Sequence, residues 1–301
     1  MNAITPPYLK PGDKIGIACT ARKMSAKETE FAVQKLKSWK LEPVLGDSID
    51  KSLHQYAGDD FTRAQDFQRM LNDDSIKAIL CARGGYGTVR IIDRLDFTRF
   101  KSNPKWIVGF SDITVLHVHV HTLFNIETLH GAMPLSFKTN TKVALDTLRD
   151  ALFGKQLEYK VKAHRLNVHG KAKGQLTGGN LSVLYSICGS RSDMSTRGKI
   201  LFLEDLDEYL YHIDRMLMQL RRSNKLRNLA GIVVGGFTKM KDNEIPFGKT
   251  ALEIVHEHAS HYGFPVAFGF PAGHIDDNRA LILGRNVELL VTEKTSELKF
   301  L

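Results

Sequence analysis

Long apolar runs and cysteines are both scarce in this chain of 301 residues. No stretch approaches the roughly 18 consecutive apolar residues of a membrane-spanning helix, so we predict no membrane partner. The first residues, MNAITPPYLKPGDKIGIAC, lack the basic and then apolar order of a secretory signal, which predicts a cytoplasmic protein. Only Cys19, Cys81 and Cys188 are present, and this odd, widely spaced set favours reduced thiols over a disulfide framework.

A basic segment specialised for nucleic acid is also missing, although the net charge is +9. Lysine and arginine are scattered, with no basic block interleaved with aromatic residues and no zinc-finger or recognition-helix pattern. We therefore interpret the charge as a solvated basic surface and predict no nucleic-acid partner. Hydrophobic residues make up 43% and charged residues 25%, which is the balance of a soluble globular protein.

The first part of the chain alternates short apolar segments with amphipathic ones. Residues 14–19, 76–82 and 106–110 have the pattern of buried parallel strands. Ser25 and Glu28 form a capping-box pattern that predicts the start of a helix. This β-α-β order predicts an α/β domain with a parallel sheet over residues 1–135.

From about residue 134 the pattern changes. A lysine-rich helix and an alternating, exposed stretch predict a connector over 136–170. Glycine-rich turns at 170–180 then introduce strands and helices of a smaller, β-rich α+β domain over 171–301. The expected strands of this domain are 199–203, 231–234 and short strands within 281–300, and its expected helices are 211–222 and 251–261.

The strongest local signal for chemistry is Gly109-Phe110-Ser111-Asp112. An apolar strand that runs into Gly-x-Ser and then a helix is typical of a nucleophile elbow, which presents the hydroxyl beside the next residue's N–H. The usual second glycine is replaced by Ile113, so the motif departs from the standard elbow. The alternative is that Ser111 only caps the helix.

A second segment, Arg83-Gly84-Gly85-Tyr86-Gly87, follows another predicted strand. Its glycines allow backbone N–H groups to approach a ligand closely, as an oxyanion hole or anion site requires. It matches neither the Walker A nor the G-x-G-x-x-G pattern, so nucleotide binding is weakly supported. A tight turn without a ligand is the alternative.

Two residues of the second half are candidates for acid–base chemistry. Glu204 ends an apolar strand, where a side chain can face a cleft, whereas the acidic residues after it suit the N-terminus of a helix. His274 lies on a loop between a glycine and acidic residues, as a general base can, although such a histidine is commonly only a surface residue.

Two rival sites remain open. His117 and His121 would share one helical face, but Val118 stands where a zincin has its glutamate, so we predict no metal. Cys81 could be a thiol nucleophile, yet it lies within an apolar strand, where cysteines are usually inert.

Six segments in order resemble the serine LD-carboxypeptidase family, whose relatives include hydrolases that give immunity to microcin C-type antibiotics. They are LKPGDKIGIACTA, ARGGYGTVRIIDRLD, IVGFSDITVLH, LTGGNLSVL, LFLEDLDEYLYHIDRML and AGHIDDNRALILG. The resemblance implies a flavodoxin-like or amidotransferase-like N-terminal domain, with the site between it and the smaller C-terminal domain. It also implies a homodimer without cofactor or metal.

The resemblance further implies roles at matching positions. Ser111 would be the nucleophile, Glu204 the acid and His274 the base, with the N–H groups of Gly85 and Asp112 as the oxyanion hole. The substrate would be a muropeptide, cleaved between an L-centre diamino acid and terminal D-alanine during cell-wall recycling. By position only, Arg83 and Gly84 are candidate substrate-binding residues.

Two other functions stay open at this stage. One is a microcin C-type immunity hydrolase that cleaves an aminoacyl-nucleotide amide with the same triad. The other is a non-catalytic α/β protein that binds a small ligand.

Overall fold

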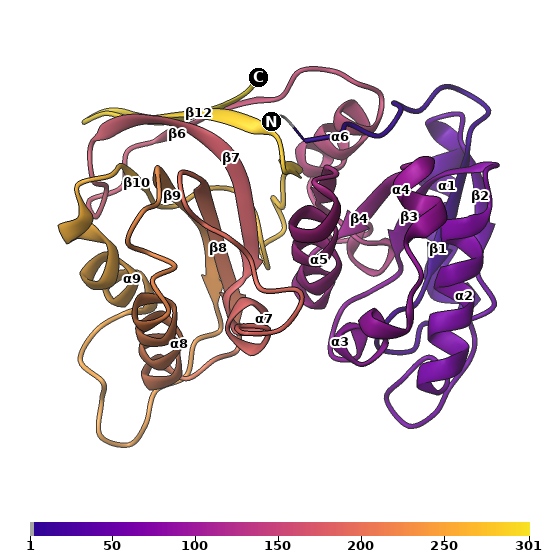
Figure 1. The fold of residues 1–301 in the computed structure, drawn as a ribbon, viewed down its shortest axis with the longest axis horizontal. Helices are drawn as coiled ribbons and strands as arrows, with labels where there is room; N and C mark the ends of the chain where they lie inside the picture. The colour runs from indigo at the N-terminus through magenta and orange to yellow at the C-terminus, as the bar shows by residue number, and fades with distance from the viewer. Residues whose placement is uncertain (1–2) are drawn as a thin grey trace.

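The computed structural model describes residues 3–301, which form two β-sheets with helix α5 (Thr114–Phe124) between them. Figure 1 shows the N-terminal half, indigo to magenta, on the right and the C-terminal half, orange to yellow, on the left. Helix α5 packs against strands of both sheets. The two halves therefore meet along the helix that follows Ser111.

The first sheet has the strand order β11-β5-β4-β3-β1-β2. Its strands are β1 (Lys14–Ala18), β2 (Glu42–Leu45), β3 (Ile76–Cys81), β4 (Trp106–Gly109), β5 (Thr128–His130) and β11 (Leu281–Leu283). Strands β1 to β5 pair in parallel, as the sequence pattern predicts, whereas β11 pairs antiparallel with β5. A strand from near the end of the chain thus completes the sheet of the N-terminal half.

Within residues 3–301, five helices accompany the first sheet, and side chains cap the first two of them. They are α1 (Ala26–Ser38), α2 (Asp60–Asn72), α3 (Thr88–Ile91), α4 (Thr98–Ser102) and α5, with 3₁₀ turns at Ile92–Arg94, Ser111–Ile113 and Pro134–Ser136. The predicted capping box is present at α1, where Ser25 and Glu28 each accept a hydrogen bond from the other's backbone N–H.

The second sheet has the strand order β10-β9-β8-β7-β12-β13-β6. Its strands are β6 (Glu158–Lys162), β7 (Gly170–Asn180), β8 (Ile200–Leu206), β9 (Gly231–Thr238), β10 (Val266–Ala267), β12 (Asn286–Val291) and β13 (Thr295–Phe300). Strands β7 to β10 pair in parallel, and β7, β12, β13 and β6 pair antiparallel, so this half is the β-rich, mixed part that the sequence predicts.

The helices α6 (Lys142–Leu152), α7 (Leu181–Ser186), α8 (Leu210–Arg222) and α9 (Ala251–Ala259) accompany this second half, and a 3₁₀ turn follows at Ser260–Tyr262. Strand β6 lies inside the expected connector and pairs with β13. The domain boundaries at 135 and 170 stay predictions.

The prediction of glycine-rich turns at 170–180 is wrong, because this segment forms β7. Its glycines are required by packing rather than by turns. A β-carbon at Gly178 would overlap the carbonyl oxygen of Phe202 on β8, and one at Gly174 would lie 2.6 Å from the carbonyl oxygen of Gly198. Glycine within a strand can mark such a close approach of backbones.

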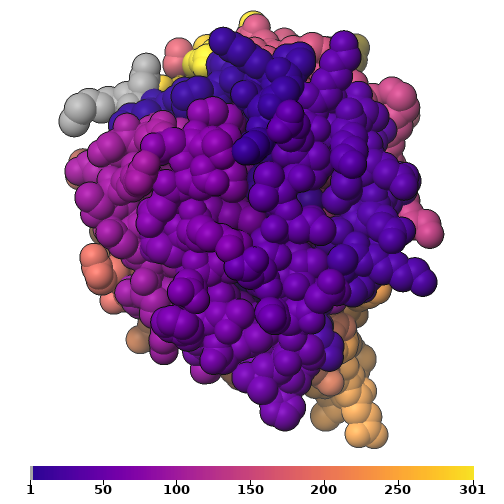
Figure 2. Space-filling model, turned by 90° about the vertical axis from the view of Figure 1, so that its right-hand side faces the viewer, coloured from indigo at the N-terminus to yellow at the C-terminus, as the bar shows by residue number. Residues whose placement is uncertain are grey.

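Figure 2 shows the face at the right-hand side of Figure 1, which is formed almost entirely by the N-terminal half. The C-terminal half appears only at the rim of this view. Within residues 3–301, no helix combines the length and the apolar character that crossing a membrane requires.

Candidate active site

Ser111 occupies a strained turn directly after β4. Its φ is 64°, in the left-handed region that a residue with a β-carbon rarely adopts. The first carbonyl of the following helical segment is its own, which accepts from the N–H of Thr114. Its Oγ makes no hydrogen bond with any residue of the described chain, so the hydroxyl does not cap the helix and is free for another role.

The glycine loop lies against this hydroxyl because β3 and β4 are hydrogen-bonded neighbours whose carboxyl ends meet at one edge of the sheet. A β-carbon at Gly84 would lie 3.1 Å from Cβ and 3.2 Å from Oγ of Ser111, and 3.5 Å from the N atom of Asp112. Gly85 has a φ of 114°, which also favours glycine. The loop backbone can therefore approach Ser111 as an oxyanion hole requires.

Two buried ionisable residues hold the glycine loop: Asp112 joins it to the segment of Ser111, and Arg63 joins it to the segment that follows β1. The carboxylate of Asp112 accepts from the N–H of Thr88 at 2.8 Å, and burial raises the pKa of this carboxyl. The fully buried guanidinium of Arg63 donates to the carbonyl oxygens of Gly87 at 3.1 Å and of Thr20 at 2.6 Å. Sequence reasoning missed both contacts, because nothing in the pattern of helix α2 marks Arg63 as buried.

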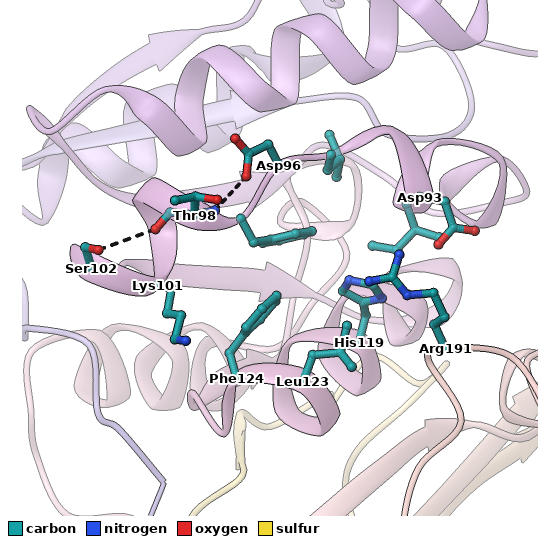
Figure 3. A pocket seen from close by; sticks show the side chains of 12 residues that line it. Asp93, Asp96, Thr98, Lys101, Ser102, His119, Leu123, Phe124 and Arg191 are labelled. Carbon is teal, nitrogen blue, oxygen red and sulfur yellow. Dashed lines mark hydrogen bonds between the residues drawn. The ribbon is translucent and has the colours of Figure 1, made fainter.

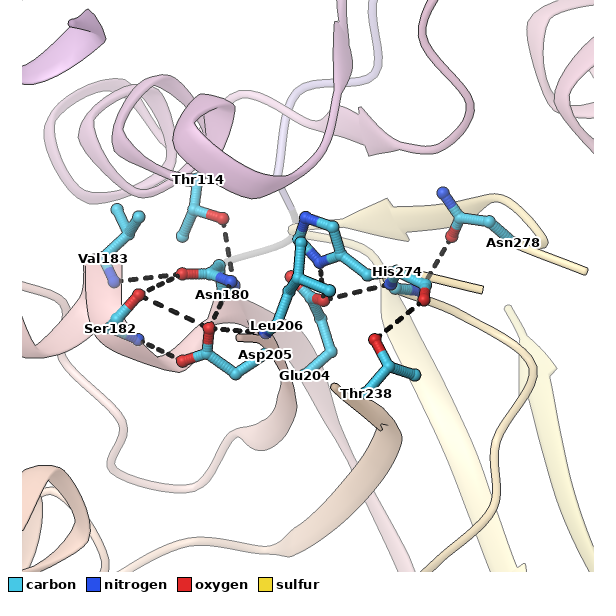
Figure 4. A network of polar contacts seen from close by, with 11 residues as sticks. Thr114, Asn180, Ser182, Val183, Glu204, Asp205, Leu206, Thr238, His274 and Asn278 are labelled. Atoms are coloured by element: carbon cyan, nitrogen blue, oxygen red, sulfur yellow. Dashed lines mark hydrogen bonds and ion pairs between the residues drawn. The ribbon is translucent and has the colours of Figure 1, made fainter. Parts of the chain in front are cut away.

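The acid and base candidates contact each other across 70 residues of sequence. Nδ1 of His274 lies 2.7 Å from Oε2 of Glu204, and the backbone N–H of His274 donates to the same oxygen at 3.2 Å. Gly273 permits this approach, since a β-carbon there would lie 2.7 Å from Cβ of Glu204. In Figure 4 the second ring nitrogen of His274 points away from Glu204, so it is available to a third group.

The electrostatics of this pair favour its charged form. Burial alone would lower the pKa of His274, but the charge and hydrogen bond of Glu204 outweigh burial, so the pKa lies above its ordinary value. Burial likewise opposes ionisation of Glu204, which is fully buried, yet His274 holds the pKa of that carboxyl below its usual value. Glu204 thus stabilises an imidazolium, which is the role of the acid in a triad.

Ser111 and His274 come from different halves of the molecule, and His274 contacts the residue that precedes Ser111. The ring of His274 packs edge-on against Phe110, the residue before Ser111, with 4.9 Å between ring centroids. The hydroxyl of Thr114 accepts from the N–H of Asn180 at 3.0 Å and joins the start of α5 to the end of β7. No hydrogen bond joins Ser111 to His274 within residues 3–301, and in unliganded enzymes this bond is often loose.

Sequence reasoning missed a second carboxylate beneath the site. Asp205 accepts from Asn180 Nδ2 at 3.0 Å, from the N–H of Ser182 at 2.8 Å and from the N–H of Leu206 at 2.8 Å (Figure 4). Burial, together with the charge of Glu204, raises the pKa of Asp205 to about 7. The sequence pattern assigns this residue to the N-terminus of the helix that follows it, α8, but it accepts instead from the first turn of α7.

His130 is a further residue that the sequence did not reveal. It ends β5, and its ring lies 4.9 Å from that of Phe202 and 5.8 Å from that of Phe110, measured between centroids. Burial lowers the pKa of His130 to about 4, so the ring is neutral at physiological pH. It therefore adds bulk, and no positive charge, beside the Glu204–His274 pair.

The rival sites have structural contacts of their own. His117 lies 2.9 Å from both the Gly109 carbonyl oxygen and Thr128 Oγ1, and burial lowers its pKa to about 3. His121 contacts Lys199, whose ammonium disfavours a cation there. Residues 3–301 contain no group of three or more metal-ligating side chains. Cys81 is fully buried, and burial raises the pKa of its thiol.

Arg83 is not directed freely into the site. Its Nη1 donates to the carbonyl oxygen of Lys23 at 3.1 Å. A substrate contact of Arg83 or Gly84 stays a prediction.

A large cavity of about 770 Å³ lies elsewhere in the molecule (Figure 3). Its aromatic lining comes from Phe97, His119 and Phe124, and Arg191 also lines it. None of the three triad candidates lines it. Cavity size therefore does not point to the chemistry, whereas side-chain geometry does.

Comparison with known proteins gives matches over most of the chain. The model of the LD-carboxypeptidase N-terminal domain matches residues 15–131, and that of the LD-carboxypeptidase C-terminal domain matches residues 173–289. A probable murein peptide carboxypeptidase of Bacillus subtilis is 35% identical over 97% of this chain and 93% of its own.

Solved structures give the same result for the fold. The muramoyltetrapeptide carboxypeptidase of Oxalobacter formigenes is 26% identical with a TM-score of 0.86, over 95% of this chain and 98% of its own. The structure of MccF in complex with glutamyl sulfamoyl guanosine has a TM-score of 0.87 at 21% identity, over 99% and 98% of the two chains. At that identity the second likeness concerns the fold alone.

Proposed function

Because this chain belongs to the LD-carboxypeptidase family, we propose that it hydrolyses the amide between an L-centre diamino acid and terminal D-alanine in muropeptides. The names of the Bacillus and Oxalobacter relatives support the substrate class. The observation that carries the mechanism is the hydrogen bond of 2.7 Å between His274 and Glu204. The ring of this histidine packs against Phe110, the residue that precedes Ser111.

In the proposed mechanism Ser111 attacks the carbonyl carbon of the diamino acid. His274 removes the hydroxyl proton through Nε2, while Glu204 holds the Nδ1–H and stabilises the imidazolium. The N–H groups of Gly85 and Asp112 stabilise the oxyanion, each contributing about 10²–10³-fold in rate. His274 then protonates the leaving amine of D-alanine, and water cleaves the acyl-enzyme by the same route. Every proton transfer is assigned to a side chain, so the mechanism requires neither metal nor cofactor.

The substitution Ser111→Ala tests this mechanism. With a synthetic tetrapeptide ending in L-lysyl-D-alanine or diaminopimelyl-D-alanine, the native protein should release D-alanine and a tripeptide, identified by mass spectrometry. Ser111→Ala should lose at least about 10³-fold in turnover, because the remaining oxyanion donors and binding act alone. Ser38→Ala, on the exposed end of α1, is the matched control and should retain activity. Equal turnover of all three proteins would contradict the proposal.

An aminoacyl-nucleotide amide is the second candidate substrate, since MccF shares the fold. Both tryptophans of this chain, Trp39 and Trp106, are buried, so neither offers an exposed indole for a nucleobase. Parallel incubation with an aminoacyl sulfamoyl nucleoside, followed by mass spectrometry, distinguishes the two substrate classes.

Cell-wall recycling in the cytoplasm and a homodimeric state belong to the same proposal. They are supported by the family resemblance and by the murein-related names of the relatives. Light scattering of the purified protein measures the oligomeric state, and fractionation of cells measures the location. A monomer would contradict the proposed homodimer, and recovery outside the cytoplasm would contradict the proposed location. Neither result would bear on the proposed reaction.

A further inference from the structure

A carboxypeptidase must recognise the terminal carboxylate of its substrate, and a cation near the nucleophile is the natural partner for this charge. Several basic residues around the glycine loop already have partners. Arg63 and Arg90 pair with Asp60, Lys23 donates to Ser52 and Arg83 donates to a backbone carbonyl. A cation at this edge of the sheet that has no such partner is a better candidate for binding a carboxylate.

Arg22 is such a cation. Its side chain is exposed and forms no hydrogen bond or ion pair with any residue from 3 to 301. Its backbone is anchored by an antiparallel bridge to Tyr56, and the next residue, Lys23, donates its N–H to the carbonyl oxygen of Gln55. The guanidinium thus has no polar partner within residues 3–301, whereas its backbone is held in place.

The position of Arg22 relative to the nucleophile follows from two consecutive glycines. A β-carbon at Gly84 would point to Oγ of Ser111 at 3.2 Å, and one at Gly85 would point to Cδ and Nε of Arg22 at 2.5 and 2.8 Å. The stem of Arg22 therefore lies across Gly85, beside the N–H group proposed to bind the oxyanion. A substrate whose scissile carbonyl is bound there has its terminal carboxylate one residue away, within the reach of an arginine side chain.

We propose that Arg22 binds the terminal carboxylate of the substrate, an inference that rests on the proposed carboxypeptidase function. The planar guanidinium can donate two parallel N–H bonds to the two carboxylate oxygens, a geometry that a lysine cannot reproduce. Arg22 is then the residue that makes the enzyme an exopeptidase, because a substrate with a blocked terminus gains nothing from it.

Comparison of two substrates tests the proposal. One is the tetrapeptide with free terminal D-alanine, and the other is the same peptide ending in D-alanine amide. Arg22→Gln should lower kcat/KM for the free acid by about 10- to 100-fold, the usual effect of losing a charge-assisted hydrogen bond, and leave the amide within about twofold. Arg22→Lys should recover only part of the loss, because the paired bonds are missing.

Lys23→Gln is the matched control, since it removes the same charge from the neighbouring residue, whose side chain is directed to Ser52. It should leave both substrates unchanged. An equal loss on acid and amide in Arg22→Gln, no loss on either, or a selective loss in Arg83→Gln instead would overturn the assignment. If the native protein cleaves neither peptide, the proposed function itself fails, and that outcome is distinguishable from a wrong assignment of Arg22.

Discussion

At the scale of single residues, the site is organised by a few contacts that shift charge. The pair of Glu204 and His274 is the clearest of these, because a buried carboxylate is stabilised by one imidazole and raises its pKa in return. A general base must be neutral to accept a proton. With His274 as the proposed base, its raised pKa determines where activity is lost on the acidic side.

The dependence of activity on pH provides the first prediction. The acidic limb of kcat/KM should have its midpoint above the ordinary histidine value of about 6.5, because Glu204 favours the charged form of His274. Glu204→Gln should move this midpoint to lower pH and reduce kcat strongly, by about 10⁴-fold if it acts as in other triads. Rates measured between pH 5 and 9 check both effects. An unchanged midpoint in Glu204→Gln would contradict the coupling.

Backbone strain at Ser111 provides the second prediction. Because φ is 64°, alanine here keeps the strain, whereas glycine relieves it. Ser111→Gly should therefore be at least as stable as Ser111→Ala, by up to about 1 kcal/mol in the free energy of unfolding. At the helical residue Ser38 the order should reverse, with glycine less stable by about 0.5–1 kcal/mol. Urea denaturation of the four variants measures both differences.

At the scale of elements, buried strands and one helix start could be predicted, because their sequence signals are local. The apolar strands β3 and β4 and the capping box of α1 were recognisable from short patterns. Strand β7 was not, because the glycines that suggest a turn are there to admit β8. A glycine in the sequence shows that a side chain is absent, but it does not show which neighbouring atoms occupy the space that the side chain would fill.

The packing of β7 against β8 provides the third prediction. Gly178→Ala introduces a β-carbon that overlaps a backbone carbonyl of β8 and requires a strained φ of 119°. It should lower the free energy of unfolding by about 2–6 kcal/mol, the sum of strain and overpacking. The control is Gly198→Ala, where φ is 69° and no atom lies within 4 Å, so only about 1–2 kcal/mol of strain is expected. Chemical denaturation of both variants measures the contrast, and equal losses would contradict it.

At the scale of the whole molecule, the two halves are joined by contacts that bring the site together. Strand β11 extends the first sheet from near the end of the chain. Close to it, Arg285 forms a buried ion pair with Glu127 at 2.6 Å, with side chains 12% and 4% exposed. Breaking one partner of a buried pair leaves an uncompensated charge, which costs more than the pair contributes.

This ion pair provides the fourth prediction. Arg285→Met should destabilise the protein by about 3–5 kcal/mol, and the double variant with Glu127→Gln should be destabilised by less, because no lone charge is then buried. Arg99→Met breaks the exposed pair with Asp74 and should leave the stability nearly unchanged, because water screens that pair. Thermal and urea unfolding of these variants measure the changes in the free energy of unfolding. A double variant that loses the full sum of the single effects would show that the two residues act independently.

Sequence by itself determined the class of fold, the family and the candidate residues Ser111, Glu204 and His274, because strand ends and glycine turns depend on a few neighbouring residues. Only tertiary structure decided that Glu204 contacts His274, that Arg63 holds the glycine loop and that Arg22 lies across Gly85. Each of these contacts joins residues that are between 24 and 70 positions apart in the sequence. These contacts depend on the order of the strands in the sheets and on the space that glycines leave free. Neither can be predicted from a short stretch of sequence.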